Sequence, residues 1–394
     1  MKTKGLITKV ILLVSFVSLF NDISSEMLYP VMPIFLRSIG FSIALIGILE
    51  GVAEATAGIS KGYFGQYSDR IGRRVPFIQL GYLLSALAKP LMIVFINPIW
   101  IFLARTTDRL GKGIRVSARD ALLSDETTKE NKGKVFGFHR AFDTIGACIG
   151  PIFALLYLWK WPGHYKMLFI IAFIPGLVSM LLTLFLKEKR NQMKSAGGKG
   201  FFSYLGYWKT ASKEFKLMVI GLLFFALMNS SDAFLLLALK AVGYNDVYMI
   251  GFYIFYNLAF ALLAFPAGIL ADKIGLRTIL IIGLVIFAIV YGLMGFAHGI
   301  VGFVLIFLFY GFYAASTEGI SKAWITNIAE KGETATALGF YNSLLSIATM
   351  LSSSLAGLIW AGFGMKAMFL VSAVGALIAA VYLSLIPLRK MSRV

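Results

Sequence analysis

The chain has 394 residues, of which 59% are hydrophobic and only 14% are charged. Soluble domains carry about 25% charged residues, so this composition excludes a soluble globular protein. The net charge of +18 comes from Lys and Arg residues that cluster between apolar runs, a pattern that indicates membrane topology and not a nucleic-acid-binding surface.

Twelve apolar runs follow one another along the chain, and each is long enough to cross a bilayer as a helix. They cover residues 8–36, 43–65, 76–95, 98–120, 134–158, 165–186, 216–240, 246–269, 278–297, 300–323, 335–362 and 364–387. Connections rich in Lys and Arg alternate with connections nearly free of them, which predicts that both termini lie in the cytoplasm. The first run continues through Asn21 and Asp22 without a small-residue cleavage site, so it is predicted to be a retained span. Cys148 is the only cysteine, which excludes a disulfide or a cysteine metal cluster within one chain.

The second half of the chain repeats motifs of the first. Three of them recur in register: Ser24-Ser25-Glu26 with Ser230-Ser231-Asp232, Gly65-x-x-x-Asp69-Arg70-x-Gly72 with Gly268-x-x-x-Asp272-Lys273-x-Gly275, and Phe136-Gly137-Phe138 with Leu338-Gly339-Phe340. A Lys- and Gly-rich connection divides the runs six and six. We therefore predict two homologous six-helix halves, 1–186 and 216–394, joined by a cytoplasmic linker at 187–215. Such repeats are typical of secondary transporters.

The stretch Gly65-Gln-Tyr-Ser-Asp69-Arg70-Ile-Gly72-Arg73-Arg74 resembles the signature loop between helices 2 and 3 of the major facilitator superfamily (MFS). The resemblance implies an all-α membrane protein with 12 transmembrane helices in two pseudo-symmetric halves, which works as a monomer. It also implies a conformational latch made by Gly65, Asp69, Arg70, Gly72 and Arg73. On the residues alone, the glycines permit a tight turn and close helix approach, whereas the arginines can equally serve only to set topology.

The fifth run contains Gly146-Ala-Cys-Ile-Gly150-Pro151, which is similar to the start of a motif associated with antiporters of the same superfamily. The sequence departs from that motif after Pro151, where no glycine pair follows. The resemblance favours export by proton antiport. Close helix packing at Gly146 and Gly150 explains the same residues equally well.

Charged side chains within the apolar runs are costly in a bilayer and are usually functional. The residues expected to couple protons or to bind solute are Asp22, Glu26, Arg105, Asp108, Arg109, Asp143, Asp232 and Glu318. Asp22 and Glu26 are four residues apart, so they face one side of the first helix and are the first candidates for the coupling carboxylate. A carboxylate balanced between burial and a nearby arginine can take up and release a proton. The alternative is that these charges form static ion pairs between helices.

The expected function is a secondary active transporter that moves a small solute across the membrane by alternating access, coupled to protons, with efflux favoured over uptake. No His-Glu-x-x-His pattern and no phosphate loop occur in the sequence, so an enzyme, a cofactor, a metal site and an ATP-driven pump are not expected. Uptake of an organic or metal-ion solute by symport or facilitation stays open, as does a non-transporting sensor. The short loops favour the bacterial inner membrane, and the substrate is not predicted.

Overall fold

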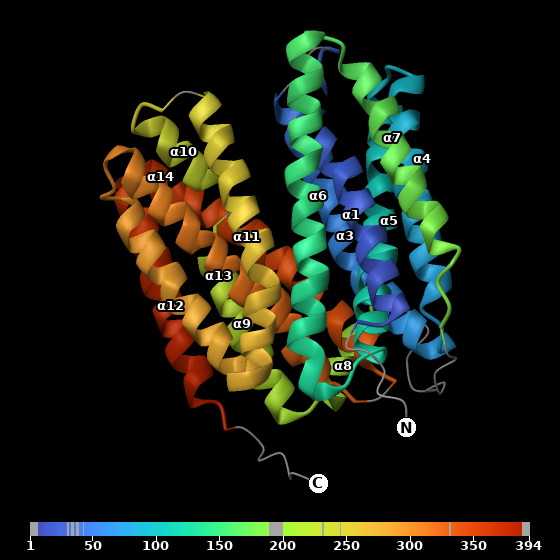
Figure 1. The fold of residues 1–394 in the computed structure, drawn as a ribbon, viewed down its shortest axis with the longest axis vertical. Helices are drawn as coiled ribbons and strands as arrows, with labels where there is room; N and C mark the ends of the chain where they lie inside the picture. The colour runs from blue at the N-terminus through green and yellow to red at the C-terminus, as the bar shows by residue number, and fades with distance from the viewer. Residues whose placement is uncertain are drawn as a thin grey trace. The chain divides into compact units, whose positions relative to one another are not determined.

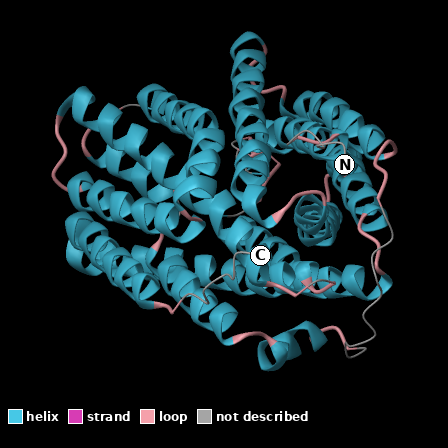
Figure 2. Cartoon of the chain, turned by 60° about the horizontal axis from the view of Figure 1, so that its bottom comes forward, coloured by secondary structure: helices cyan, strands magenta, loops and turns pink. Residues whose placement is uncertain are grey.

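The structure is a computed structural model that describes residues 7–29, 31–32, 35–36, 39–41, 43–188, 200–230, 232–244, 246–330 and 332–387. Every regular element in this part of the chain is a helix, as Figure 2 shows. The predicted all-α fold is confirmed for these residues. Ser231 and the core of the predicted linker, at 189–199, lie outside the described residues.

The chain forms two compact units, which we call unit 1 and unit 2. Unit 1 comprises Met1–Thr128, Phe138–Gly206 and Glu330–Ser343, and unit 2 comprises Lys129–Gly137, Tyr207–Ala329 and Leu344–Val394. Most of each unit comes from one predicted half, and one short segment of each half belongs to the other unit. The division into two six-helix halves stays a prediction.

Unit 1 is built from long helices (Figure 1). They are α1 (Lys9–Leu28), α3 (Ile43–Ile71), α4 (Val75–Val94), α5 (Pro98–Asp125), α7 (Tyr165–Thr183) and the greater part of α6 (Lys132–Lys160), with the short turn η2 (Ser203–Gly206). Local sequence sets where two of them begin. The hydroxyl of Thr8 accepts a hydrogen bond from the N–H of Ile11 at 3.2 Å, and the side chain of Asn97 accepts one from the N–H of Ile99 at 2.9 Å. Each satisfies an amide at a helix start that has no partner within the helix.

Unit 2 contains the remaining helices of the described chain. They are η1 (Lys129–Asn131), α8 (Tyr207–Thr210), α9 (Lys213–Met228), α10 (Ala233–Ala241), α11 (Asp246–Ile274), α12 (Leu276–Met294), α13 (Gly299–Ile328) and most of α14 (Thr334–Leu385). Helix α9 begins where the side chain of Ser212 accepts a hydrogen bond from the N–H of Phe215 at 3.2 Å.

The predicted span at 216–240 is not one helix. Helix α9 ends at Met228 and α10 begins at Ala233. At the break, the amide of Asn229 donates to the hydroxyl of Tyr313 at 2.9 Å, and the hydroxyls of Ser230 and Tyr291 are 3.2 Å apart. Hydropathy did not show this break, because the apolar residues on both sides outweigh the short polar stretch. Broken helices are tolerated at membrane depth where neighbouring side chains satisfy the polar groups.

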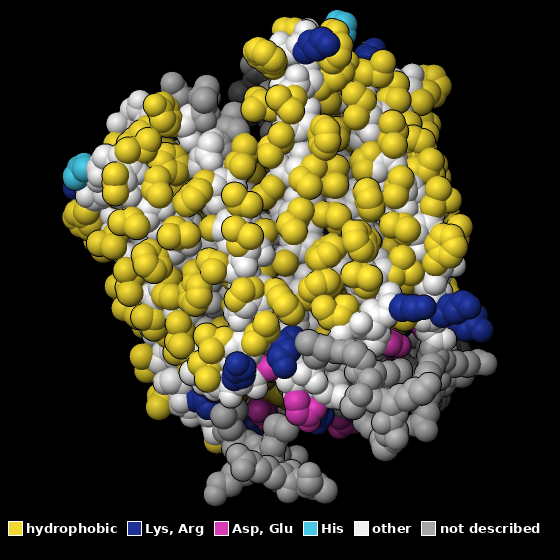
Figure 3. Space-filling model, in the orientation of Figure 1, with side chains coloured by type: hydrophobic (Ala, Val, Ile, Leu, Met, Phe, Trp, Pro, Cys, Tyr) yellow, Lys and Arg dark blue, Asp and Glu magenta, His cyan; other side chains and the backbone are white. Residues whose placement is uncertain are grey.

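Eight helices of the described chain are long and apolar enough to cross a membrane. One of them, α14, has 52 residues and contains Gly364 with φ of 86° and ψ of 167°, which divides it into two helical segments. The sequence predicts a boundary at the same place, between 335–362 and 364–387. On the face shown in Figure 3, hydrophobic side chains cover the middle of the helices, and visible Lys and Arg side chains gather toward their ends. This distribution suits helices that cross a bilayer, and twelve spans stay a prediction.

Helices α4 and α5 approach each other closely at two glycines. A Cβ atom on Gly81 would lie 2.6 Å from the carbonyl oxygen of Gly111, and a Cβ atom on Gly111 would lie 2.6 Å from the carbonyl oxygen of Gly81. Small residues at membrane helix interfaces permit such backbone contact. The approach lets the Ser85 hydroxyl of α4 donate to the carbonyl oxygen of Asp108 in α5 at 3.1 Å. It therefore places α4 against the charged face of α5.

The glycine contact predicts the effect of one added methyl group. Gly81→Ala should lower the melting temperature of the purified protein, because overpacking of a well-packed contact costs about 1–3 kcal/mol. Gly292→Ala in α12 is the matched control, since an added Cβ there meets nothing within 4 Å. Equal melting temperatures for the two variants would contradict the close approach of α4 and α5.

Candidate functional site

A charged cavity of about 250 Å³ lies within unit 1 among helices α1, α3, α4 and α5. Its ionisable lining residues are Glu26, Glu54, Lys89, Arg105, Asp108, Arg109 and Lys112. Helix α5 supplies the last four, because their spacing of three and four residues places them on neighbouring parts of one helix face. The structure thus brings together four of the residues expected from the sequence, namely Glu26, Arg105, Asp108 and Arg109.

Two carboxylates of the charged cavity are engaged in ion pairs. Asp108 lies 3.3 Å from Nη1 of Arg105 and 3.8 Å from Nζ of Lys89. Glu54 lies 3.6 Å from Nη1 of Arg109. Lys89 is almost fully buried, and its ammonium group also donates to the carbonyl oxygen of Ser85 at 3.0 Å. Burial of charges is tolerable here because each is compensated by a partner.

Glu26 and Lys112 differ from the other ionisable groups of the charged cavity. Both line it, and within the described residues neither takes part in a hydrogen bond through its side chain or in an ion pair. Lys112 is acted on by the carboxylates of Glu54 and Glu26, and Glu26 is acted on by Lys112 and Arg109. These two groups therefore interact with each other and with neighbouring charges over longer distances than the ion pairs of Asp108 and Glu54.

A second charged cluster joins α5 to α6. Asp143 lies 3.6 Å from Nε2 of His139, 3.6 Å from Nη1 of Arg140 and 3.9 Å from Nη1 of Arg119. Arg119 also donates to the hydroxyl of Ser18 at 2.9 Å. Two arginines and a histidine thus converge on Asp143, which suits the alternative interpretation of ion pairs that hold helices together.

Asp22 does not line the charged cavity. Its carboxylate accepts a hydrogen bond from the amide of Asn21 at 3.1 Å, and a Cβ atom on Gly146 would lie 3.0 Å from the Asp22 Cβ. A Cβ atom on Gly150 would lie 2.7 Å from the carbonyl oxygen of Ile23. These two glycines therefore pack α6 directly against the backbone of α1, and α6 continues through Pro151 without a break.

The carboxylate of Asp232 lies at the start of α10 in unit 2. It accepts a hydrogen bond from the hydroxyl of Tyr310 at 2.6 Å. The ring of Tyr310 is 4.9 Å from that of Tyr256 and 5.2 Å from that of Tyr313, measured between centroids. Glu318 is partly buried on α13, the helix that also carries Tyr310. Asp232 of unit 2 therefore lies beside phenol groups, whereas the carboxylates in the charged cavity of unit 1 lie beside cationic side chains.

The carboxylate of Asp69 caps the N-terminus of α14. It accepts hydrogen bonds from the N–H of Ala335 at 3.3 Å, the N–H of Thr336 at 2.5 Å and the Thr336 hydroxyl at 2.6 Å. Arg74 pairs with the same carboxylate at 2.5 Å, and both side chains are buried. Burial lowers the pKa of Arg74, but the carboxylates of Asp69 and Asp125 outweigh it and raise the pKa above its ordinary value. An anion at a helix N-terminus is favourable because the unpaired amides there carry positive charge.

The other residues of the expected latch lie around this cap. Gly65 packs against the carbonyl oxygen of Ala335, and Gly72 has a φ of 68°, the left-handed conformation that favours glycine. Arg70 is partly buried, and the side chain of Arg73 is exposed. The arginine that pairs with Asp69 is Arg74, which was not among the expected latch residues.

The repeat copy in unit 2 shares the helix cap and the glycine contact of this arrangement. The carboxylate of Asp272 in α11 accepts hydrogen bonds from the N–H of Gly133 at 2.8 Å and from the N–H of Lys134 at 2.9 Å, at the N-terminus of α6. Gly268 packs against the backbone of Gly133, as Gly65 packs against Ala335. Both copies of the loop motif therefore place an aspartate on the N-terminus of a helix.

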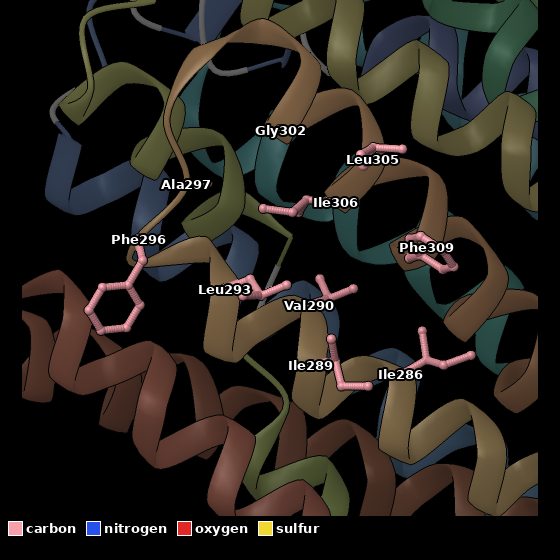
Figure 4. A pocket seen from close by; sticks show the side chains of 10 residues that line it. All are labelled: Ile286, Ile289, Val290, Leu293, Phe296, Ala297, Gly302, Leu305, Ile306 and Phe309. Atoms are coloured by element: carbon pink, nitrogen blue, oxygen red, sulfur yellow. The ribbon is translucent and has the colours of Figure 1, made fainter.

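A larger cavity of about 430 Å³ lies between α12 and α13 in unit 2 (Figure 4). All ten of its lining residues are apolar or glycine, and several, including Ile289, Leu293 and Phe309, are exposed. Such a groove offers no polar group to orient a solute, whereas ligand sites usually combine apolar walls with a few placed polar groups. The smaller charged cavity is the stronger candidate.

The sequence contains one match to the Gly-x-Ser-x-Gly pattern of hydrolases, at residues 58–62. It lies inside α3, and Ser60 is 2% exposed. A nucleophilic serine of that kind requires an exposed turn between a strand and a helix. The match is therefore no evidence for a hydrolase site.

Lys89 and Lys112 line the charged cavity but were not among the site residues expected from the sequence. Lys89 is the only charged residue of the predicted span 76–95, and this isolation in an apolar run was the signal that could have found it. Lys112 follows Arg109 by three residues, so the face of α5 that carries the arginines predicts its position.

Comparison with known proteins assigns this chain to a family. The profile of the Major Facilitator Superfamily matches residues 14–257 and 246–393. An uncharacterised MFS-type transporter of Methanocaldococcus jannaschii is 32% identical over 362 residues, which cover 90% of this chain and 89% of that protein.

Two solved structures share the fold. The human organic anion transporter MFSD10 matches with a TM-score of 0.78 and 17% identity, over 95% of this chain and 98% of that chain. The fucose:proton symporter of Escherichia coli matches with a TM-score of 0.80 and 13% identity, over 96% of this chain and 98% of that chain. Likeness at such low identity shows the fold alone. Because the family profile and the archaeal relative both span most of the sequence, this chain is a multi-pass integral membrane protein that belongs to the Major Facilitator Superfamily of transporters.

Proposed function

We propose that this chain is a proton-coupled secondary transporter that moves a small solute by alternating access, with Glu26 as the coupling carboxylate. The position of Glu26 carries the proposal, since it lines the charged cavity and, among the described residues, is held in no ion pair. Lys112, Arg109 and Arg105 of α5 and Arg140 of α6 act on it. Burial favours the protonated form of a carboxylate and nearby cations favour the ionised form. A carboxyl group on which both influences act can take up or release a proton when the cavity opens to water on one side of the membrane or the other.

The remaining expected residues have supporting places in this proposal. Arg105, Asp108 and Arg109 set the charge of the cavity through their pairs. Asp22 and Asp143 belong to the neighbouring polar region between α1, α5 and α6, and Asp22 is the second candidate for proton coupling. Asp232 and Glu318 are the acidic groups that unit 2 contributes.

The charge of the solute decides the direction of coupling. A cationic solute would compete with the proton for Glu26, which gives antiport, whereas an anionic solute would bind together with the proton, which gives symport. The Gly146-to-Pro151 motif supports export by antiport, and the excess of cations in the cavity supports symport. We place the protein in the bacterial inner membrane as a monomer with both termini in the cytoplasm, from the Lys and Arg distribution and the family resemblance.

Glu26→Gln tests the coupling. In proteoliposomes with an internal pH dye, a panel of small carboxylates, amines and sugars should include a solute that drives proton movement through the native protein. Glu26→Gln should abolish that movement while solute exchange at equal concentrations on both sides continues, because the amide cannot carry a proton. Glu330→Gln, an exposed position outside the charged cavity, is the matched control.

Retained proton movement in Glu26→Gln would mean that Glu26 is not the coupling carboxylate. Asp22 would then be the remaining candidate on α1. Solute flux without any proton movement in the native protein would contradict proton coupling itself.

We also propose that Asp69 with Arg74, and Asp272 with the N-terminus of α6, are latches that stabilise one conformation of the transport cycle. In each, a carboxylate neutralises the amides at a helix N-terminus. These contacts involve segments far apart in the sequence, so they can break and re-form as whole helices move. Buried hydrogen bonds to charged groups contribute about 1.5–3 kcal/mol each, which is enough to bias such an equilibrium.

Arg74→Gln should slow solute exchange by about tenfold, the change that corresponds to roughly 1.4 kcal/mol. It should also lower the melting temperature, because the buried Asp69 carboxylate loses its cation. Arg73→Gln is the control at the adjacent, exposed arginine and should leave exchange near the native rate. Equal slowing in both variants would mean that the positive charge of the turn matters and not the pair with Asp69.

A further inference from the structure

We propose that the charged cavity binds a small amphipathic solute with one anionic group, a carboxylate being the simplest case, and that Lys112 is its main charged contact. This inference rests on the proposed transport function and names the substrate class of the same site. It is carried by the charges, the pairing and the shape of the cavity.

The wall of the charged cavity carries an excess of positive charge. Four cationic side chains and three carboxylates line it. With all of them ionised the wall carries one excess positive charge, and with Glu26 protonated it carries two. Electrostatic interactions in a cavity of low dielectric are far stronger than in water, so an excess cation there favours binding of an anion.

Two of the three carboxylates in the cavity wall already form ion pairs. Asp108 is engaged by Arg105 and Lys89, and Glu54 is engaged by Arg109. A cationic solute would have to displace these cations to reach a carboxylate. An anionic solute would meet the ammonium group of Lys112, on which the carboxylates of Glu54 and Glu26 act, but which forms no ion pair among the described residues. It would compete with these two carboxylates and would not have to break an ion pair.

The cavity is small, and part of its wall is apolar. Its volume of about 250 Å³ is below the range of about 300–1,000 Å³ that is usual for drug-sized ligands, so the solute is small. Leu28, Met32 and Met92 line the same cavity as the charged groups. A solute with an apolar body and one anionic end therefore matches both parts of the wall.

Binding of an anion has a consequence for coupling. Burial opposes the ionised form of Glu26, and the cations of Lys112, Arg109, Arg140 and Arg105 favour it. An anion bound at Lys112 offsets part of that positive field, so a proton should bind together with the solute. The inference thus favours cotransport of proton and anion over exchange.

Matched solutes that differ only in charge test the inference. Benzoate, benzamide and benzylamine, and butyrate, butyramide and butylamine, would be titrated against the purified full-length protein, with the rise in melting temperature as the measure of binding. We expect at least one carboxylate to bind at least tenfold more tightly than its amide and its amine. Lys112→Met should reduce that affinity at least tenfold, and Lys112→Arg should restore it. Lys213→Met, at an exposed lysine at the start of α9, should leave it unchanged.

The inference is overturned if no carboxylate of the panel binds, if an amine or amide binds as tightly as the acid, or if Lys112→Met binds the acid as the native protein does. These outcomes are separate from failure of the proposed function. Proton movement that an amine drives and Glu26→Gln abolishes would keep the transport proposal and reject the anion. Carboxylate binding without proton movement by any solute would keep the anion and reject the coupling.

Discussion

Ionised side chains among apolar helices need compensating charges, and this requirement organises unit 1. Helix α5 carries arginines, a lysine and an aspartate on one face. In the charged cavity this face lies beside acidic groups of α1 and α3 and beside Lys89 of α4. The close glycine contact between α4 and α5 makes the pairing of Lys89 with Asp108 possible. Breaking one side of such a buried pair leaves an uncompensated charge and is strongly destabilising. The paired groups therefore hold the wall of the cavity together, and Glu26 and Lys112 are the residues that we propose to act on the proton and the solute.

Asp69 and Asp272, the aspartates of the repeated motif, also have their charge compensated, in this case by the amides at helix N-termini. Asp69 and Asp272 each lie where the amides of a helix N-terminus are unpaired, and each is followed by a turn that begins the next helix. Glu54 and Asp69 both belong to α3 and are fifteen residues apart, which is about 22 Å along a helix. Helix α3 therefore carries one residue of the charged cavity and one residue of a proposed latch.

The sequence predicted the family and the helical fold because hydropathy and repeated motifs are properties of the chain itself. The break at Gly364 was predicted in this way, and the break near Asn229 was not, since its polar residues are satisfied by tyrosines of distant helices. Helical spacing was enough to predict that the charges of α5 share one face of the helix. It was not enough to predict which carboxylate of the cavity lies outside an ion pair among the described residues, because that depends on how α1, α3 and α4 pack around α5. The pairing of Asp69 with Arg74 was likewise not predicted, because it depends on the turn at Gly72.

The most direct test of the central claim is whether the charged cavity opens to both sides of the membrane. Ser25 lines the cavity, and Cys148 is the only native cysteine, so Ser25→Cys in a Cys148→Ser background gives a single reporter. A membrane-impermeant thiol reagent would be applied to intact cells and, separately, to inside-out vesicles. Alternating access predicts labelling from both sides, with each rate changed by a bound solute. Labelling from one side alone under every condition would contradict it and would leave the cavity as the site of a protein that binds but does not transport.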